Sequence, residues 1–200
     1  MTSKAPCEGP LDEQSREVAL GIVRCALGEA VARGETTPLR PAWIVESVGV
    51  VPAVFGEFLG AFVSLHDSEG GLRGCIGNIV PYASLLETLW GRAQDAALND
   101  PRFAPVSVRE CVSLQVEVSV LTPPREIDTR DEIVLGRHGI ILQKLGRSAV
   151  FLPQVPPEQG WDLGQTLTAL SRKAGLSGNA WHDGAVLKVF EAQVFGGPAQ

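Results

Sequence analysis

The stretch Gly70-Gly71-Leu72-Arg73-Gly74-Cys75-Ile76-Gly77-Asn78 organises the rest of the chain. Glycine weakens a strand by roughly 0.5–1 kcal/mol relative to alanine, so its repeated use here indicates that another segment or a ligand approaches the backbone closely. If residues 72–78 are extended, Arg73, Cys75 and Gly77 share one face, and Gly77 leaves that face bare. A guanidinium two residues from a thiol favours the nucleophilic thiolate. The alternative is a tight hairpin that holds a buried structural cysteine.

Composition limits the classes of protein that fit. The 200 residues suit one domain or two small lobes, and 44% hydrophobic with 20% charged residues is typical of a soluble globular protein. The formal net charge of −6 does not indicate the basic groove of a nucleic-acid-binding protein. The polar start of the chain predicts no secretory leader, and no apolar run is long enough to span a membrane. We therefore expect a cytoplasmic protein with reduced thiols.

Metal and nucleotide motifs are missing from the sequence. The cysteines are Cys7, Cys25, Cys75 and Cys111, and no two of them form a CxxC pair. A standard zinc site is therefore not expected, and we predict no metal ligands. No GxGxxG fingerprint or Walker loop is present. The sequence leaves the cofactor, if the protein uses one, unknown.

The first half of the chain contains two helix patterns and a hairpin. Apolar residues recur at helical spacing over residues 11–33 and 82–98, and Ser84-x-x-Glu87 is a capping-box pattern. Prolines and glycines predict loops and short helical turns over residues 35–57. Residues 58–66 are a strand candidate that pairs with residues 72–78 as an antiparallel hairpin. His66 ends that strand; its face depends on the loop geometry, and we expect a surface residue.

A regular strand follows the second helix. Residues 112–120 alternate apolar and polar side chains without interruption. Glu117 lies on the polar face, where it is either exposed to water or lines a cleft as a base or an anchor. Between the helix and this strand, Asp100 and Arg102 flank Pro101, and we expect their side chains to form an ion pair that clamps the loop.

The second half of the chain has shorter elements. The breaker Thr122-Pro123-Pro124 marks a lobe boundary, and residues 133–152 predict a small antiparallel sheet. Asp162-x-x-Gln165 predicts a helix start and Gly175 its end. Residues 185–195 predict a final strand that returns to the first sheet.

Several runs resemble one known family. In order, they are Leu72-Arg73-Gly74-Cys75-Ile76-Gly77, Asp100-Pro101-Arg102-Phe103, Glu117-Val118-Ser119-Val120-Leu121, Gly136-Arg137-His138-Gly139, Phe151-Leu152-Pro153-Gln154-Val155 and Lys173-Ala174-Gly175-Leu176. Together they resemble the AMMECR family, and the similarity covers about residues 12–195.

The resemblance implies an α+β fold with two lobes and a cleft between them. The larger lobe is an antiparallel sheet with flanking helices built from both chain ends, and the smaller is an inserted antiparallel-sheet lobe. We therefore expect a disordered tail over residues 1–10, a large lobe over residues 11–123 and 180–200, and a small lobe over residues 124–179. The resemblance implies that the cysteine motif faces the cleft.

Cys75 is the candidate nucleophile, and a nucleophile needs a base within reach and a third group that orients the base. His138 lies between glycines in a run that matches the family, so we predict that it is the base; His182 is second. Glu117 is placed to orient the base or to bind a substrate amine. Forked hydrogen bonds from arginine suit anionic groups. The candidate substrate-binding residues are Arg73, Gly74, Gly77, Arg137 and Gln154.

Three functions fit these observations. The first is an enzyme that uses Cys75, His138 and Glu117 on a peptide, nucleobase or small metabolite. The second is a non-catalytic binding or adaptor module; the name of the prokaryotic members, AmmeMemoRadiSam system protein A, implies Memo-like and radical-SAM proteins as partners. The third is nucleic-acid recognition or modification, which the acidic charge balance opposes.

Overall fold

The computed structural model describes residues 9–199 and has an α+β fold, as expected. It divides into two compact units, Met1–Leu121 with Gln193–Gln200, and Thr122–Ala192. Residues 180–192, which the sequence analysis assigned to the larger lobe, belong to the second unit. The tail expected over residues 1–10 falls largely on residues 1–8, which lie outside the described part of the chain, as does Cys7.

Two long helices dominate the first unit, and both were predicted. Helix α1 (Glu13–Arg33) begins at Asp12, whose carboxylate accepts the Ser15 N–H, and ends at Gly34 with φ of 70°. Helix α3 (Leu85–Leu98) begins three residues later than predicted, because Ser84 and Glu87 form the capping box that sets its start. The short elements α2 (Pro41–Val48) and η1 (Ala53–Gly56) occupy the proline-rich segment, as predicted.

The sheet of the first unit places β1 (Ala61–His66) between β2 (Leu72–Asn78) and β3 (Gln115–Leu121), with both pairs antiparallel. The predicted hairpin is confirmed, and the carboxylate of Asp67 closes its turn by accepting the N–H groups of Glu69 and Gly71. The other edge of β3 adjoins the last residues of β7 (Val186–Pro198).

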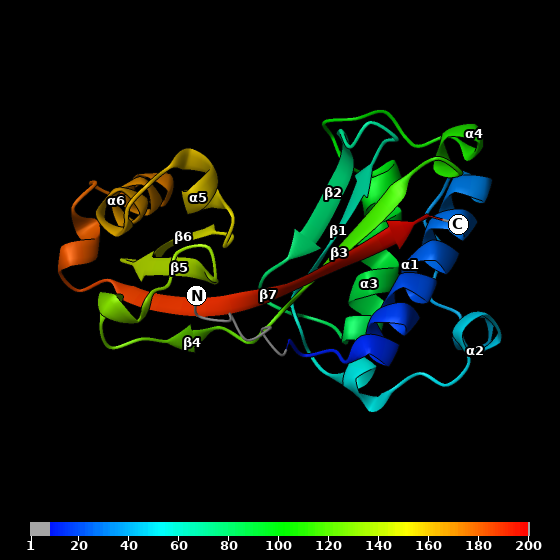
Figure 1. Cartoon of the computed structure of the whole chain (residues 1–200), viewed down its shortest axis with the longest axis horizontal. Coiled ribbons are helices and arrows are strands. Elements are labelled where there is room, and N and C mark those ends of the chain that lie inside the picture. Colours follow the sequence, from blue (N-terminus) through cyan, green and yellow to red (C-terminus); the bar gives the residue numbers. More distant parts are fainter. Residues whose placement is uncertain (1–8, 200) are drawn as a thin grey trace, which may run out of the picture. The chain divides into compact units, whose positions relative to one another are not determined.

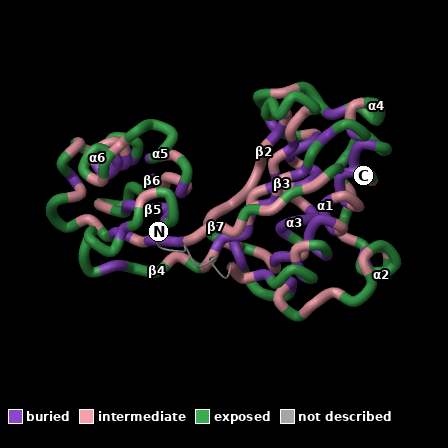
Figure 2. The backbone as a smooth tube through the Cα atoms, in the orientation of Figure 1, coloured by how far each residue is buried: buried purple, intermediate pink, exposed green. Residues whose placement is uncertain are grey.

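One face of this sheet is core and the other is not. Helices α1 and α3 lie side by side against the core face (Figure 1). The side chains that point to them are buried: Ala61, Val63, Leu65, Val116, Val118 and Val120. The tube in Figure 2 accordingly alternates between buried and partly exposed residues along these strands. Polar side chains therefore gather on the opposite face.

The strand predicted from residue 112 begins only at Gln115. Residues Val108–Cys111 form a short helix, α4, capped by Ser107 and Glu110, and the Ser113 N–H donates to the Glu110 carbonyl. Val112 is exposed as a result. The prediction for residues 112–114 was wrong because local capping hydrogen bonds outweigh the alternating pattern at this end.

The second unit contains the small antiparallel sheet and the helix that were predicted, but residues 133–135 are not a strand, and the short helix over residues 155–159 was not predicted. Strand β5 (His138–Lys144) lies between β6 (Arg147–Phe151) and β7, and β4 (Arg125–Glu126) pairs with β7. Its helices are η2 (Arg130–Glu132), α5 (Val155–Gln159), α6 (Leu163–Lys173) and η3 (Ala180–His182). Asp162 and Gln165 cap α6 as predicted. The unit has its own hydrophobic core, formed mainly by isoleucine and leucine.

Candidate functional site

A row of three polar side chains crosses the open face of the first sheet. Ser64 on β1 lies opposite Cys75 on β2 and, on its other side, opposite Glu117 on β3. Directly opposed residues share a face of the sheet. All three are half-buried. Since neighbouring strands are about 4.8 Å apart, the backbones of Cys75 and Glu117 lie about 10 Å apart, with Ser64 between them.

The Ser64 hydroxyl donates a hydrogen bond to the Cys75 sulfur. The Oγ–Sγ distance is 3.2 Å. A donor aimed at sulfur stabilises negative charge that develops there, in the way that preorganised donors do in active sites. Ser64 is thus placed to support Cys75 as a nucleophile.

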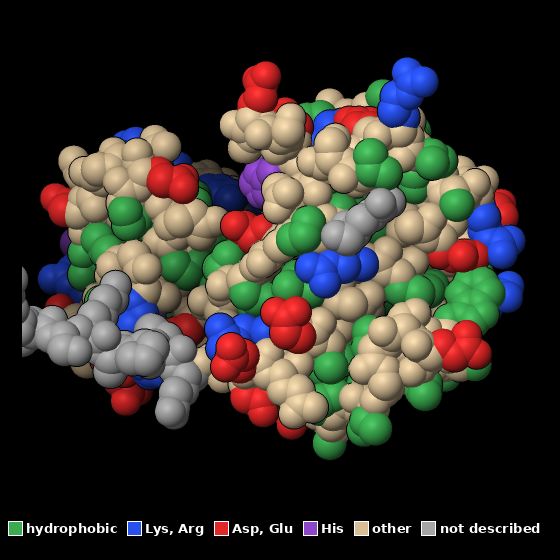
Figure 3. All heavy atoms as spheres, turned by 45° about the vertical axis from the view of Figure 1, so that its right-hand side comes forward, with side chains coloured by type: hydrophobic (Ala, Val, Ile, Leu, Met, Phe, Trp, Pro, Cys, Tyr) green, Lys and Arg blue, Asp and Glu red, His purple; other side chains and the backbone are tan. Residues whose placement is uncertain are grey.

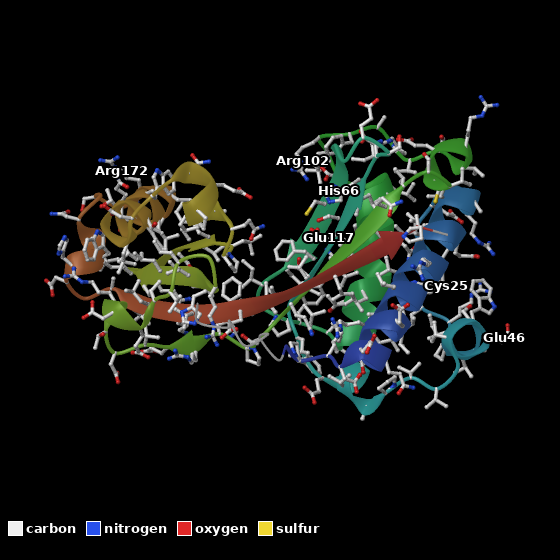
Figure 4. All side chains as sticks on the ribbon, viewed as in Figure 1. Cys25, Glu46, His66, Arg102, Glu117 and Arg172 are labelled. Atoms are coloured by element: carbon white, nitrogen blue, oxygen red, sulfur yellow. The ribbon has the colours of Figure 1, made fainter. Side chains whose placement is uncertain are left out.

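His66 lies on the same face, one position further along β1. It lies two residues after Ser64 and has the same parity, so the pairing of Ser64 with Cys75 and Glu117 makes His66 a diagonal neighbour of both. Diagonal neighbours are within reach of aromatic side chains. The Nε2 atom is buried and has no hydrogen-bond partner among the described residues. Figure 4 shows His66 and Glu117 on one side of the sheet, with Arg102 beside β2.

Asp100 and Arg102 hold the backbone of Cys75 at the sheet edge. The Asp100 carboxylate accepts the Cys75 N–H at 2.8 Å, and the Arg102 guanidinium donates to the Cys75 carbonyl at 3.2 Å. Arg102 also donates to both oxygens of Asp100, at 2.9 and 2.7 Å. The expected loop clamp is confirmed, and it acts directly on the candidate nucleophile's backbone.

Asp100 and Arg102 stabilise each other's charged forms. Asp100 is only 4% exposed, whereas the Arg102 side chain is 53% exposed. The Arg102 hydrogen bonds, together with the Cys75 N–H, hold the pKa of the Asp100 carboxyl well below its usual range against the effect of burial. The same contact raises the pKa of Arg102. The clamp is therefore fully charged at neutral pH.

The predicted substrate-binding residues of β2 have structural contacts. Arg73 forms an ion pair with Glu110 of α4 and donates to the Ala104 carbonyl at 2.8 Å, so its guanidinium is engaged by the 100–110 segment. A Cβ on Gly74 would overlap the Ala96 carbonyl oxygen, and one on Gly77 would overlap the Phe62 ring. The expectation that Gly77 leaves its face bare is wrong, because Phe62 covers it.

The remaining predicted site residues belong to the second unit. His138 is 7% exposed, and its Nδ1 accepts the Val134 N–H at 3.2 Å, which places the proton of the neutral ring on Nε2. Burial lowers the pKa of His138. Arg137 forms an ion pair with Glu191 at 2.9 Å. Gln154 is exposed at the start of α5, and His182 stacks on Trp181.

Two other cysteines are described. Cys111 is buried, and burial raises the pKa of its thiol. Cys25 is half-buried on α1 and accepts a weak hydrogen bond from Ser47. Within residues 9–199, no cluster of three His, Cys, Asp or Glu side chains is arranged to hold a metal ion. No helix in that part of the chain is long and apolar enough to cross a membrane.

Comparison with known proteins shows which family this chain belongs to. The model of the AMMECR1 family matches residues 22–195. This chain belongs to the AMMECR1 family. A Methanosarcina mazei protein is 41% identical over 192 residues, covering 92% of each chain, and a Methanocaldococcus jannaschii protein is 44% identical over 154 residues, covering 72% of this chain and 76% of the other.

A solved structure agrees with the AMMECR1 assignment. The crystal structure of an uncharacterised Pyrococcus horikoshii protein matches with a TM-score of 0.74 and 34% identity, covering 93% of this chain and 92% of that one. The names of these relatives state no activity. Function within the family therefore has to be argued from the site.

Sequence reasoning overlooked Ser64, and it took His66 for a surface residue, whereas His66 is half-buried and its Nε2 atom is buried. The signal was present: in residues 61–66, buried Ala61, Val63 and Leu65 alternate with the half-buried residues of the other face. The pairing of that strand with residues 72–78 turns this alternation into a face shared with Cys75. The sequence could not predict the register of the β1–β2 pairing, which shifts by one residue next to His66.

Proposed function

We propose that this protein is a cytoplasmic, thiol-dependent enzyme whose reaction takes place on the open face of the β2–β1–β3 sheet. The observation that carries the proposal is the row of Cys75, Ser64 and Glu117, with the partnerless Nε2 of His66 on the same face. Acyl transfer through cysteine requires a nucleophile with a base within reach, and here a hydrogen-bond donor and a carboxylate lie on the same face to position the thiol and the substrate. All four come from rigid strands of one unit.

The proposed reaction proceeds in two steps. His66 Nε2 takes the proton of the Cys75 thiol, the sulfur attacks an acyl carbonyl carbon, and the departing group leaves with the proton from His66. Water, deprotonated by the same imidazole, then cleaves the thioester, and the thiol regains its proton. Ser64 stabilises charge on sulfur, and Glu117 binds a positively charged group of the substrate.

In this proposal His66 replaces His138 as the base. Nδ1 of His138 already accepts a backbone hydrogen bond, and burial disfavours its protonated form. His66 carries a buried nitrogen with no partner in the described chain. A base must have a free acceptor atom, and His66 meets that requirement within the unit that carries Cys75.

The test is acylation by an activated ester, p-nitrophenyl acetate, followed by mass spectrometry of the intact chain and of its peptides. We expect one acetyl group on Cys75 and its slow hydrolysis. His66→Gln should slow acylation by about a hundredfold, the usual contribution of a general base. Cys25→Ser and His138→Gln are the matched controls and should acylate at the normal rate. Acetylation of Cys75 that is equally fast in His66→Gln would refute the assignment of the base.

The second candidate is a binding module whose same face takes a protein partner, of the Memo-like or radical-SAM class. The observation that favours it is that no hydrogen bond within residues 9–199 joins His66 to Cys75 or to Glu117. Here alkylation of Cys75 would abolish partner binding, and no ester would turn over. A nucleic-acid role has less support, because acidic and basic side chains are interspersed over the first unit on the face in Figure 3.

A further inference from the structure

A pocket in the second unit is lined by none of the four residues of the proposed reaction. It has a volume of about 420 Å³ and is formed by the segments around η2 and η3. Ile127 and Leu187, both buried, form its apolar floor, and Trp181 forms a wall. Asp128, Arg130 and His182 are exposed on its rim. This volume falls within the range of small-molecule sites, roughly 300–1,000 Å³.

Two contacts hold the Trp181 ring in place. The Trp181 Nε1–H donates to the Thr168 hydroxyl of α6 at 3.3 Å, and the His182 ring stacks on Trp181 with centroids 3.7 Å apart and planes at 25°. Aromatic pairs of this kind present flat surfaces and a polar edge. The wall suits a flat ring better than a bulky aliphatic group.

The Arg130 guanidinium on the rim contacts an aromatic ring but forms no hydrogen bond with the described residues. The Arg130 guanidinium lies 5.0 Å from the centre of the Trp181 ring, and no described residue accepts a hydrogen bond from it. Two other arginines of this unit are engaged, Arg125 by Glu132 and Arg147 by the Gly175 carbonyl. A guanidinium that rests on an aromatic face keeps its planar fork of donors for a carboxylate.

We propose that this pocket binds a flat aromatic monocarboxylate. Arg130 would move off the Trp181 ring to hold the carboxylate in a forked pair, and the ligand ring would take its place against Trp181, over the floor of Ile127 and Leu187. Asp128 adds a negative charge at the same rim, so a singly charged ligand is favoured over a dianion such as a phosphate monoester. The pocket is built by the second unit alone, and the proposal does not depend on the thiol chemistry of the first.

The test is NMR titration of the full chain with benzoate, following the Trp181 indole N–H, which the Trp181→Phe variant assigns. We expect a saturable shift, with about tenfold weaker binding for benzamide and for the Arg130→Gln variant, the loss of one charge-assisted contact. Arg130→Lys should weaken binding severalfold, because it keeps the charge and loses the fork. Arg172→Gln, an exposed position on α6 that does not line the pocket (Figure 4), should bind as the unmodified chain does.

Each alternative outcome would overturn the proposal. No saturable shift at millimolar benzoate would show that the pocket does not take this ligand. Equal losses in Arg130→Gln and Arg172→Gln would show general charge attraction rather than a site. If cyclohexane carboxylate binds as tightly as benzoate, the pocket does not select a flat ring. If inorganic phosphate binds more tightly than benzoate, the pocket is a phosphate site and not a carboxylate site. The indole signal itself reports whether each variant is folded.

Discussion

The Cys75 run and the His138 run look alike in sequence, since each places a reactive side chain among glycines, yet the two units treat them differently. On the first sheet, Cys75 is half-buried and receives a hydrogen bond from Ser64, and Nε2 of the neighbouring His66 has no partner among residues 9–199. In the second unit, His138 is buried, and its Nδ1 accepts a backbone N–H. Glycine-rich runs alone therefore do not identify a site; the partners of their polar atoms do.

A second contrast concerns the backbone. The outer edge of β2 at Cys75 is closed by side chains from a segment 25 residues away, whereas His138 lies on β5, paired with β7 through Glu191. A sheet edge with unpaired N–H and C=O groups is open to wrong partners. The clamp of Asp100 and Arg102 closes this edge at one residue and leaves the Cys75 side chain accessible.

The largest effect should follow from removing the clamp. Asp100→Ala leaves the Cys75 N–H without its acceptor and Arg102 without its partner, and we expect the free energy of unfolding to fall by about 2–3 kcal/mol. Unfolding in urea measures this loss of free energy. Truncation of the exposed member of the pair, Arg102→Ala, should lower the free energy of unfolding by less, because the Asp100 carboxylate still accepts the Cys75 N–H.

The same variant should show a defined pH dependence. The folded protein holds the pKa of Asp100 below its unfolded value, so the unfolded state binds the proton first as pH falls. The stabilisation is complete above about pH 4, the unfolded pKa, and is lost progressively below it. The difference in unfolding free energy between the unmodified chain and Asp100→Ala should therefore be largest at about pH 7 and shrink towards about pH 2. A difference that grows on acidification would contradict the clamp.

A smaller effect should come from the glycine that lets β2 approach α3. Gly74→Ala would drive its Cβ into the Ala96 carbonyl oxygen, and we expect a loss of about 2 kcal/mol in unfolding free energy. Gly91→Ala is the matched control within α3: its Cβ meets nothing within 4 Å, and alanine in a helix interior should stabilise by up to about 1 kcal/mol. Thermal unfolding of the two variants should shift in opposite directions. A neutral Gly74→Ala would contradict the close packing of β2 on α3.

The parts of the fold that local chemistry determines were predictable from sequence. The capping box of α3 was readable from Ser84 and Glu87, although the helix was predicted three residues too early, and the β1–β2 hairpin from its glycines and Asp67. The start of the strand expected at residue 112 was wrong. Ser107-x-x-Glu110 has the same capping-box spacing as Ser84-x-x-Glu87, but the alternating apolar pattern of residues 112–120 outweighed it in the prediction.

The site was predictable only in part, for a physical reason. Cys75 and Glu117 were identified from their strands, but their shared row depends on β1 lying between them, which no local pattern specifies. The face of His66 depends on an irregular register at the hairpin end, and the Asp100 contact with Cys75 spans 25 residues. Contacts of this kind are set by tertiary packing, which the sequence pattern does not contain.

The most direct test of the account is the rate of Cys75 alkylation by iodoacetamide as a function of pH, with Cys7, Cys25 and Cys111 replaced by alanine. We predict that His66→Gln slows alkylation about tenfold at about pH 7 and leaves the rate unchanged at about pH 10, where a free thiol ionises without a base. His138→Gln should leave both rates unchanged. An unaltered rate in His66→Gln at both pH values, or a loss confined to His138→Gln, would contradict it.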